Sequence, residues 1–226
     1  MNMAKALEKR WGGRLGIYLT GMLSVSLGIV LCVKCEMGIS PISSWPYVLS
    51  YALPLSFGTL TMLFHLLNII LQFILQRRIR DIRIWLQVPV AVIFGRIIDI
   101  FQKFVVIDSS FWTYRCLALL LSILFTAFGM VCMINMQLVQ NPPDGTVHLL
   151  SRKTGIEMGK VKIVYDVIMM SGSVVFSLVA FGKMVGLGIA TIASAIFVGK
   201  TVSWMQKYIG SNLKERFDRE NNPLKI

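Results

Sequence analysis

Five ionisable side chains lie inside apolar stretches of the sequence, where a charge is expensive to hold: His65, Arg96, Asp99, Asp166 and Lys200. An Asp, Lys or Arg at the centre of a membrane helix costs about 2.5 to 3.5 kcal/mol, so such residues face a protein interior or water and usually serve a purpose. Arg can grip a carboxylate or phosphate with two parallel hydrogen bonds, while Lys offers a compact point charge. We therefore expect Arg96 and Lys200 to attract an anionic solute, with His65, Asp99 and Asp166 as coupling or counter-ion groups.

Each of these residues also has a structural interpretation. Arg96 and Asp99 are three residues apart and could form an ion pair on one helix face. Asp166 could simply neutralise the lysines near the start of its span, and Lys200 could extend toward the membrane interface. His65 is either a core histidine or a group whose protonation changes near neutral pH.

The sequence lacks the common catalytic and cofactor motifs. It has no Walker loop, no H-E-x-x-H and no G-x-S-x-G, and it has only two histidines. Cys32 and Cys35 form a lone C-x-x-C without the second pair or the histidines that a zinc site needs. We expect neither an enzyme nor a bound metal or cofactor. The cysteines are interpreted as small apolar helix residues, with a Cys32–Cys35 disulfide as the alternative.

Composition places these residues in a membrane. Hydrophobic residues make up 55% of the 226 residues, and the mean hydropathy is +0.69. Apolar runs long enough to cross about 30 Å of hydrocarbon predict transmembrane helices. Six such runs occur, at 15–33, 59–76, 84–106, 116–136, 161–181 and 185–205.

The placement of the charges predicts the orientation. A net charge of +12 is compatible with a nucleic-acid partner, but the cations are not arranged as one patch. Seventeen Lys and Arg residues flank the spans on one side, and the opposite loops and span ends hold only Lys34, Lys103, Arg115 and Lys183. By the positive-inside rule, both termini are cytoplasmic, and we expect no nucleic-acid partner.

Two halves of the chain repeat. A constant offset of 101 residues pairs Gly28 with Gly129, Pro41 with Pro142, Ser50 with Ser151 and Gly58 with Gly159. After a slip to 104, Gly95 matches Gly199. The alignment equates Arg96 with Lys200 and His65 with Asp166. Each copy has three spans, so the second copy is inverted, an architecture that recurs in secondary transporters. The predicted segments are a cytoplasmic N-terminus (1–14), repeat 1 (15–106), repeat 2 (107–208) and a polar cytoplasmic tail (209–226).

Each repeat also contains a short segment that we call a half-helix, at 41–53 and 142–153. Ser40 and Asn141 are favoured N-cap residues, and Pro41 and Pro142 then occupy the first helical position. We expect these four residues to aim helix N-termini at an anionic solute in a shared central cavity. The alternative is a pair of interfacial helices on the bilayer surface. A topology in which both segments cross fully would give eight spans, but it conflicts with the charge asymmetry.

Particular segments resemble the YczE/YyaS/YitT-like bacterial membrane proteins, nearest the YczE-like branch. They include Met37-Gly38-Ile39-Ser40-Pro41 in the first half and Ala195-Ile196-Phe197-Val198-Gly199 in the second. The resemblance runs from about the first span to the sixth and implies a bacterial membrane fold. It supplies no binding residues that carry over.

These observations predict an all-α protein of six transmembrane helices in two inverted repeats, in the bacterial cytoplasmic membrane. We expect a small secondary transporter of an anionic or carboxylate-bearing solute. The alternatives are a substrate-binding membrane subunit of a larger transporter and a non-transporting accessory protein. Expected partners are the lipid bilayer, a small solute, and either a second copy or another membrane protein.

Overall fold

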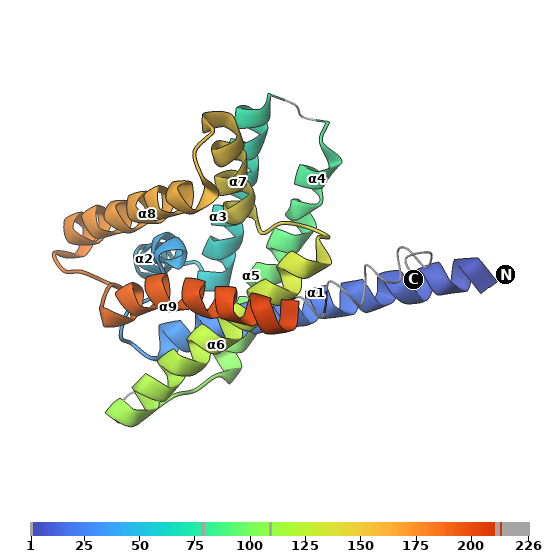
Figure 1. Cartoon of the computed structure of the whole chain (residues 1–226). Helices are drawn as coiled ribbons and strands as arrows, with labels where there is room; N and C mark the ends of the chain where they lie inside the picture. The colour runs from blue at the N-terminus through green and yellow to red at the C-terminus, as the bar shows by residue number, and fades with distance from the viewer. Residues whose placement is uncertain (1, 78–79, 109, 211–212, 214–226) are drawn as a thin grey trace.

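The computed structural model describes residues 2–77, 80–108, 110–210 and 213, which form helices and turns without a strand (Figure 1). The long helices are α1 (Asn2–Lys34), α3 (Phe57–Gln76), α5 (Gln87–Phe104), α6 (Trp112–Met136), α8 (Met158–Phe181) and α9 (Ile189–Met205). The short ones are η1 (Pro41–Ser43), α2 (Ser44–Ala52), α4 (Ile82–Trp85), α7 (Pro142–Thr154) and a π-helical turn, η2 (Gln206–Gly210). Most of the predicted tail lies outside the described residues.

Within this part of the chain, five helical segments are long and apolar enough to cross a membrane. They are Gly12–Lys34, Phe57–Gln76, Ile82–Phe104, Trp112–Met136 and Met158–Phe181. These segments match the first five predicted spans, and they have the composition of a multi-pass membrane protein.

The sixth predicted span is shorter in the structure than in the sequence pattern. The chain turns at Gly182 and Gly186, where φ is 66° and 71°, so α9 begins only at Ile189 and has 17 residues. At 1.5 Å per residue such a helix is about 25 Å long, less than the hydrocarbon thickness. The third span is also interrupted, between α4 and α5, because Pro89 cannot donate to the carbonyl four residues before it.

Both half-helices begin where the sequence predicts. Ser40 and Asn141 occupy the N-cap positions of η1 and α7, and a proline follows each of them. Neither N-cap side chain accepts a hydrogen bond from a backbone N–H of its helix, so the proline, with its preset φ, is what marks each start. α2, which continues η1, packs against α3 and α8, and α7 packs against the same two helices.

The two longest helices, α1 and α6, cross at small residues. A β-carbon built on Gly28 would lie 2.8 Å from Thr126 N and 2.9 Å from the carbonyl oxygen of Ser122. One built on Gly129 would lie 2.7 Å from Val25 N and would also meet the carbonyl oxygen of Gly21. Backbones can approach this closely only because the glycines have no side chain.

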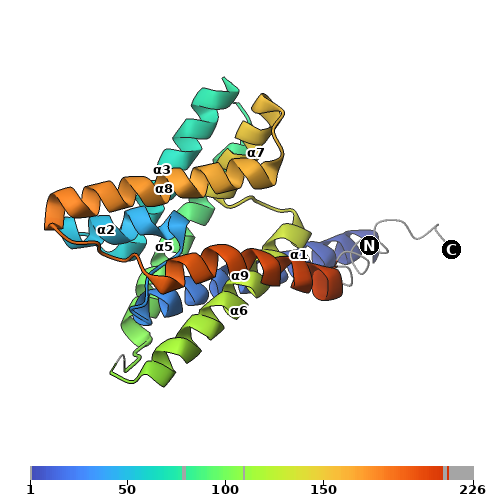
Figure 2. The same cartoon turned by 60° about the vertical axis from the view of Figure 1, so that its left-hand side comes forward.

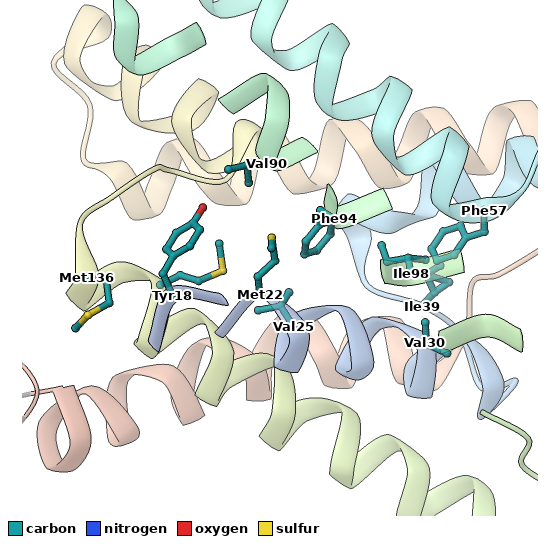
Figure 3. Close-up of a cluster of buried hydrophobic side chains, with 11 residues drawn as sticks. Tyr18, Met22, Val25, Val30, Ile39, Phe57, Val90, Phe94, Ile98 and Met136 are labelled. Carbon is teal, nitrogen blue, oxygen red and sulfur yellow. The ribbon is translucent and has the colours of Figure 1, made fainter. Parts of the chain in front are cut away.

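A core of apolar side chains joins α1 to α5. Met22, Phe94 and Ile98 are at most 1% exposed, and Tyr18 and Val25 pack beside them (Figure 3). Helix α6 packs against α1 and also against α9. The pair α1 and α6 is therefore a central unit with α5 against α1 and α9 against α6.

The arms α3–α5 and α8–α9 differ in their spacing. α3 and α5 touch at Gly58 and Gly95, because a β-carbon on either one would overlap the carbonyl oxygen of the other. α8 and α9 lie apart, with α2 between them in both views (Figures 1 and 2). A β-carbon on Gly199 would meet no neighbouring atom within 4 Å, and one on Gly159 would meet only Glu157 Oε1, at 4.0 Å.

Candidate functional site: a cation-lined cavity

An open cavity of about 980 Å³ lies where α1 and α5 end. Five parts of the chain line it: the end of α1 with the loop after it, α2, the start of α3, the last two turns of α5, and the loop between α8 and α9. Residues from both predicted repeats therefore form its wall. The volume is in the range of small-molecule sites.

Three cations line the cavity, and none has an ion-pair or hydrogen-bond partner among the described residues. They are Lys34 at the end of α1, and Arg96 and Lys103 on α5. Arg96, Asp99 and Lys103 are three or four residues apart, which places them along one face of the helix. The last two turns of α5 thus present a polar face to the cavity.

The carboxylate of Asp99 is engaged by the N-terminus of α3. It accepts hydrogen bonds from Ser56 Oγ (2.7 Å) and from Gly58 N (2.8 Å). Ser56 is itself the N-cap of α3 and accepts from Thr59 N at 3.2 Å. The alternative of an Arg96–Asp99 ion pair is therefore wrong: Asp99 caps a neighbouring helix, whose amides and partial positive charge stabilise a carboxylate there. Arg96 is left facing the cavity.

Hydroxyl groups supply further polar surface. The hydroxyls of Tyr47 and Tyr51 are 2.8 Å apart, and the Tyr47 ring packs edge-on against Phe57 at 5.9 Å between centroids. Both tyrosines line the cavity, together with Ser50 and Gln102. A solute there would meet hydroxyl and amide groups as well as the cations.

The loop at the end of α1 is held by α6. Arg115 donates from Nε to the carbonyl oxygen of Cys35 (2.9 Å) and from Nη2 to that of Glu36 (2.7 Å). Glu36 has a φ of 53°, an uncommon backbone conformation for a residue other than glycine. The two bonds from Arg115 hold this loop, which lines the cavity. Cys32 and Cys35 are free and buried. A hydrogen bond from the Cys32 side chain lowers the pKa of the Cys35 thiol.

Of the predicted site residues, Arg96 and Asp99 line this cavity. Lys200 is exposed on α9 and lies elsewhere. His65 is 3% exposed and stacks on Phe94 at 5.3 Å between ring centroids, with Nδ1 unpartnered, so its surroundings are those of the core alternative.

The four residues at the half-helix N-termini do not line the cavity, although Gly38 and Ile39, which precede Ser40, do. Pro41 and Pro142 are buried, and Ser40 Oγ bonds only to Ser43 Oγ, at 3.1 Å. Asn141 Oδ1 is buried without a hydrogen-bond partner. The structure therefore does not bring these four residues together with Arg96.

Asp166 belongs to a separate cluster. Lys162 Nζ lies 3.9 Å from Asp166 Oδ2 and 3.4 Å from Asp144 Oδ1. Beside it, Tyr165 donates to Asn68 Oδ1 at 2.7 Å. This geometry matches the alternative in which Asp166 neutralises a nearby lysine.

Sequence reasoning missed Lys34 and Lys103 as site residues, although it held a signal for them. They are two of only four cations at the predicted outer loops and span ends, where the positive-inside rule disfavours them. A charge kept at such a place needs a reason, and the cavity supplies one. No signal of this kind identified the tyrosines.

The helices have the length and composition of a multi-pass membrane protein, and the fold contains a cation-lined cavity. The chain belongs to a family whose model matches residues 12–207 and is described as "Family of unknown function (DUF6198)". Searches among curated proteins and among solved structures gave no match.

Proposed function

We propose that this protein is a small secondary transporter that binds an anionic or carboxylate-bearing solute in the cavity beside Arg96. The observation that carries the proposal is the imbalance of charge there. Lys34, Arg96 and Lys103 have no partner among the described residues, whereas Asp99 is engaged by α3, which leaves Glu36 as the uncommitted carboxylate of the lining. Arg96 and Lys103 are exposed and Lys34 is half-buried, so an anion that enters the open cavity would be attracted by all three charges.

Within this proposal each cation has its own role. The Arg96 guanidinium is suited to a carboxylate or phosphate, because its planar fork can donate two parallel bonds. Lys34 and Lys103 lie nearer the ends of their helices, where they would attract the solute as it enters. Tyr47 and Tyr51 would bind its polar or aromatic part.

The proposed architecture is a pair of inverted repeats, with α1, α2, α3 and α5 equivalent to α6, α7, α8 and α9. Helix packing supports it: α1 packs against α5 as α6 does against α9, and α7 packs against α3 as α2 does against α8. The α1–α6 crossing supports it in more detail. A β-carbon on Gly28 would meet the backbone N of Thr126 and the carbonyl O of Ser122. One on Gly129 would meet the backbone N of Val25 and the carbonyl O of Gly21. Gly28 and Gly129, Val25 and Thr126, and Gly21 and Ser122 are each 101 residues apart.

We place the protein in the bacterial cytoplasmic membrane, with both termini in the cytoplasm, and relate it to the YczE-like branch. In this topology the chain crosses the membrane six times, and α9 with η2 forms the sixth crossing. Arg80 lies in the loop between α3 and α4 and is exposed. Because Cys116 is exposed near the predicted outer end of α6, the test uses a variant whose four cysteines are replaced by alanine. In that variant Arg80→Cys should react with a membrane-impermeant maleimide only after the cells are opened. Labelling in intact cells would overturn the inverted topology.

Binding and transport are tested with a panel of small carboxylates, amino acids and inorganic phosphate. We expect at least one to stabilise the purified protein in a thermal-shift assay and to cross proteoliposomes that contain this chain alone. Arg96→Gln should weaken binding at least about tenfold, which corresponds to the loss of one charge-assisted hydrogen bond. Lys103→Arg keeps the cavity charge and is the matched control.

Three outcomes would contradict parts of the proposal. Binding without flux would favour a subunit of a larger transporter. No binding across the panel would favour an accessory protein. Equal affinity in Arg96→Gln and the parent, with both proteins eluting as single peaks, would remove Arg96 from the site.

A further inference from the structure

The two arms of the molecule carry the same contact residues but use them differently. Gly58 and Gly95 bring α3 and α5 into backbone contact. The repeat places Gly159 and Gly199 at the equivalent positions of α8 and α9, yet neither meets another helix within 4 Å. Gly199 lies inside α9, where a glycine destabilises the helix relative to alanine, and Gly159 lies in the first turn of α8, as Gly58 does in α3. Because the closed arm uses these two positions for its helix contact, the pair on α8 and α9 points to an arrangement in which it makes the same contact.

The hydrogen bonds that join the central unit to the arms also differ between the two halves, and here it is the second half that has the contact. Asn135 of α6 and Gln206 after α9 exchange two side-chain hydrogen bonds, of 2.8 and 2.9 Å. Their equivalents are Lys34 and Gln102, which both line the open cavity and are not bonded to each other. The helices α3 and α5 touch each other, and the cavity between the ends of α1 and α5 is open. The helices α8 and α9 do not touch at their glycines, and the Asn135–Gln206 pair joins the ends of α6 and α9.

We infer that the chain has a second arrangement in which the two repeats exchange these conformations, and that this creates a second anion-binding cavity. In it, α8 closes on α9 through Gly159 and Gly199, and the Asn135–Gln206 pair opens. At the same time Lys34 approaches Gln102 and the described cavity closes. The new cavity is lined by the equivalents of the first, with Lys200 in the place of Arg96 and Lys207 in the place of Lys103.

This inference rests on the proposed transport function and deepens it. It assigns Arg96 and Lys200 to one anion in succession and not together, since only Arg96 lines the described cavity. Ser203 and Gln137 stand where Asp99 and Glu36 do in the first half, and Glu157 stands where Ser56 does, so the second cavity has one carboxylate fewer. The same class of solute, a carboxylate or phosphate, is expected in both cavities.

Thiol cross-linking in membranes tests the geometry without any solute. In a variant whose four cysteines are replaced by alanine, Gly159→Cys and Gly199→Cys should be joined by a short bifunctional thiol reagent. Gly159→Cys with Phe197→Cys is the negative control, because Phe197 is exposed on the opposite face of α9. Asn135→Cys with Gln206→Cys is the positive control, since those side chains already touch.

Coupling between the two ends is read with a third cysteine. Ser50→Cys lines the described cavity. After the Gly159–Gly199 cross-link has formed, its labelling by an impermeant maleimide should fall roughly tenfold, as expected for a population driven to the closed form. A Gly159–Gly199 pair that stays unjoined while the positive control reacts would overturn the inference, as would unchanged labelling at Ser50→Cys. Either result leaves anion binding at Arg96 to be judged by its own assay.

Discussion

The arms α3–α5 and α8–α9 have equivalent glycines, but only the first arm is closed. Gly58 and Gly95 are in contact, whereas Gly159 and Gly199 are free of other helices. The closed arm has an additional link, the bond from Gly58 N to Asp99, and Ser203 at the equivalent position donates only to the carbonyl of Gly199 in its own helix. The glycines that the predicted repeat equates therefore pack differently in the two arms, and the long-range bonds of Asp99 accompany the closed one.

Substitution of the glycines tests the difference between the two arms most directly. Gly58→Leu should lower the free energy of unfolding by about 3 kcal/mol, because the new side chain overlaps the carbonyl oxygen of Gly95 and the helices must separate. Gly199→Leu should leave stability unchanged or raise it by up to about 1 kcal/mol, because the site is open and leucine favours helix.

Denaturant unfolding in detergent micelles, followed by circular dichroism, measures both variants. Gly16→Leu is the control for the substitution itself, since a β-carbon on Gly16 also meets nothing within 4 Å. Equal losses at Gly58 and Gly199 would mean that the two arms are packed alike.

A smaller effect is expected at Asp99. Asp99→Ala removes the acceptor of Ser56 Oγ and Gly58 N and should cost about 2 kcal/mol, the range for hydrogen bonds to a charged group. Ser203→Ala, the matched change in the open arm, should cost close to nothing because Ser203 is exposed. The same Asp99→Ala variant should bind an anion more tightly, since a negative charge leaves the cavity lining.

The two readouts at Asp99 separate its roles. Unfolding measures its link to α3, and titration of the solute identified by the thermal-shift panel measures its charge. A loss of stability together with unchanged affinity would remove Asp99 from the solute's surroundings. Weaker anion binding in a well-folded Asp99→Ala protein would reverse the proposed sign of the cavity charge.

The sequence predicted the elements well, because their signals are local. Apolar length defines the spans, and a proline after Ser40 and after Asn141 defines the start of each half-helix. The late start of α9 was missed, since an apolar run of residues does not reveal that Gly182 and Gly186 turn the chain.

The site was predicted only in part, because its geometry depends on distant contacts. Arg96 and Asp99 were identified from the cost of charge at membrane depth, and both line the cavity. The alternative of an ion pair between them is not what the structure shows, because Asp99 binds Ser56, which is 43 residues away in the sequence. The repeat led us to expect Lys200 in the same cavity as Arg96, and Lys200 does not line it. A repeat shows which positions are equivalent in sequence, but it does not show that the two arms have the same conformation.

The smallest expected effect concerns the amide pair that closes the second half. Gln206→Leu removes both hydrogen bonds to Asn135 and should cost about 0.6 kcal/mol, the average for side-chain hydrogen bonds between membrane helices. Gln102→Leu should cost less, because Gln102 has no bond to its equivalent partner Lys34. A double-mutant cycle with Asn135→Leu isolates the pair, since the second substitution should add nothing once the first has removed both bonds. Lys34→Leu with Gln102→Leu forms the matched cycle and should show no coupling in the described arrangement. Coupling of the same size in both cycles would mean that the two halves are closed alike, and the asymmetry between the arms would then not extend to their ends.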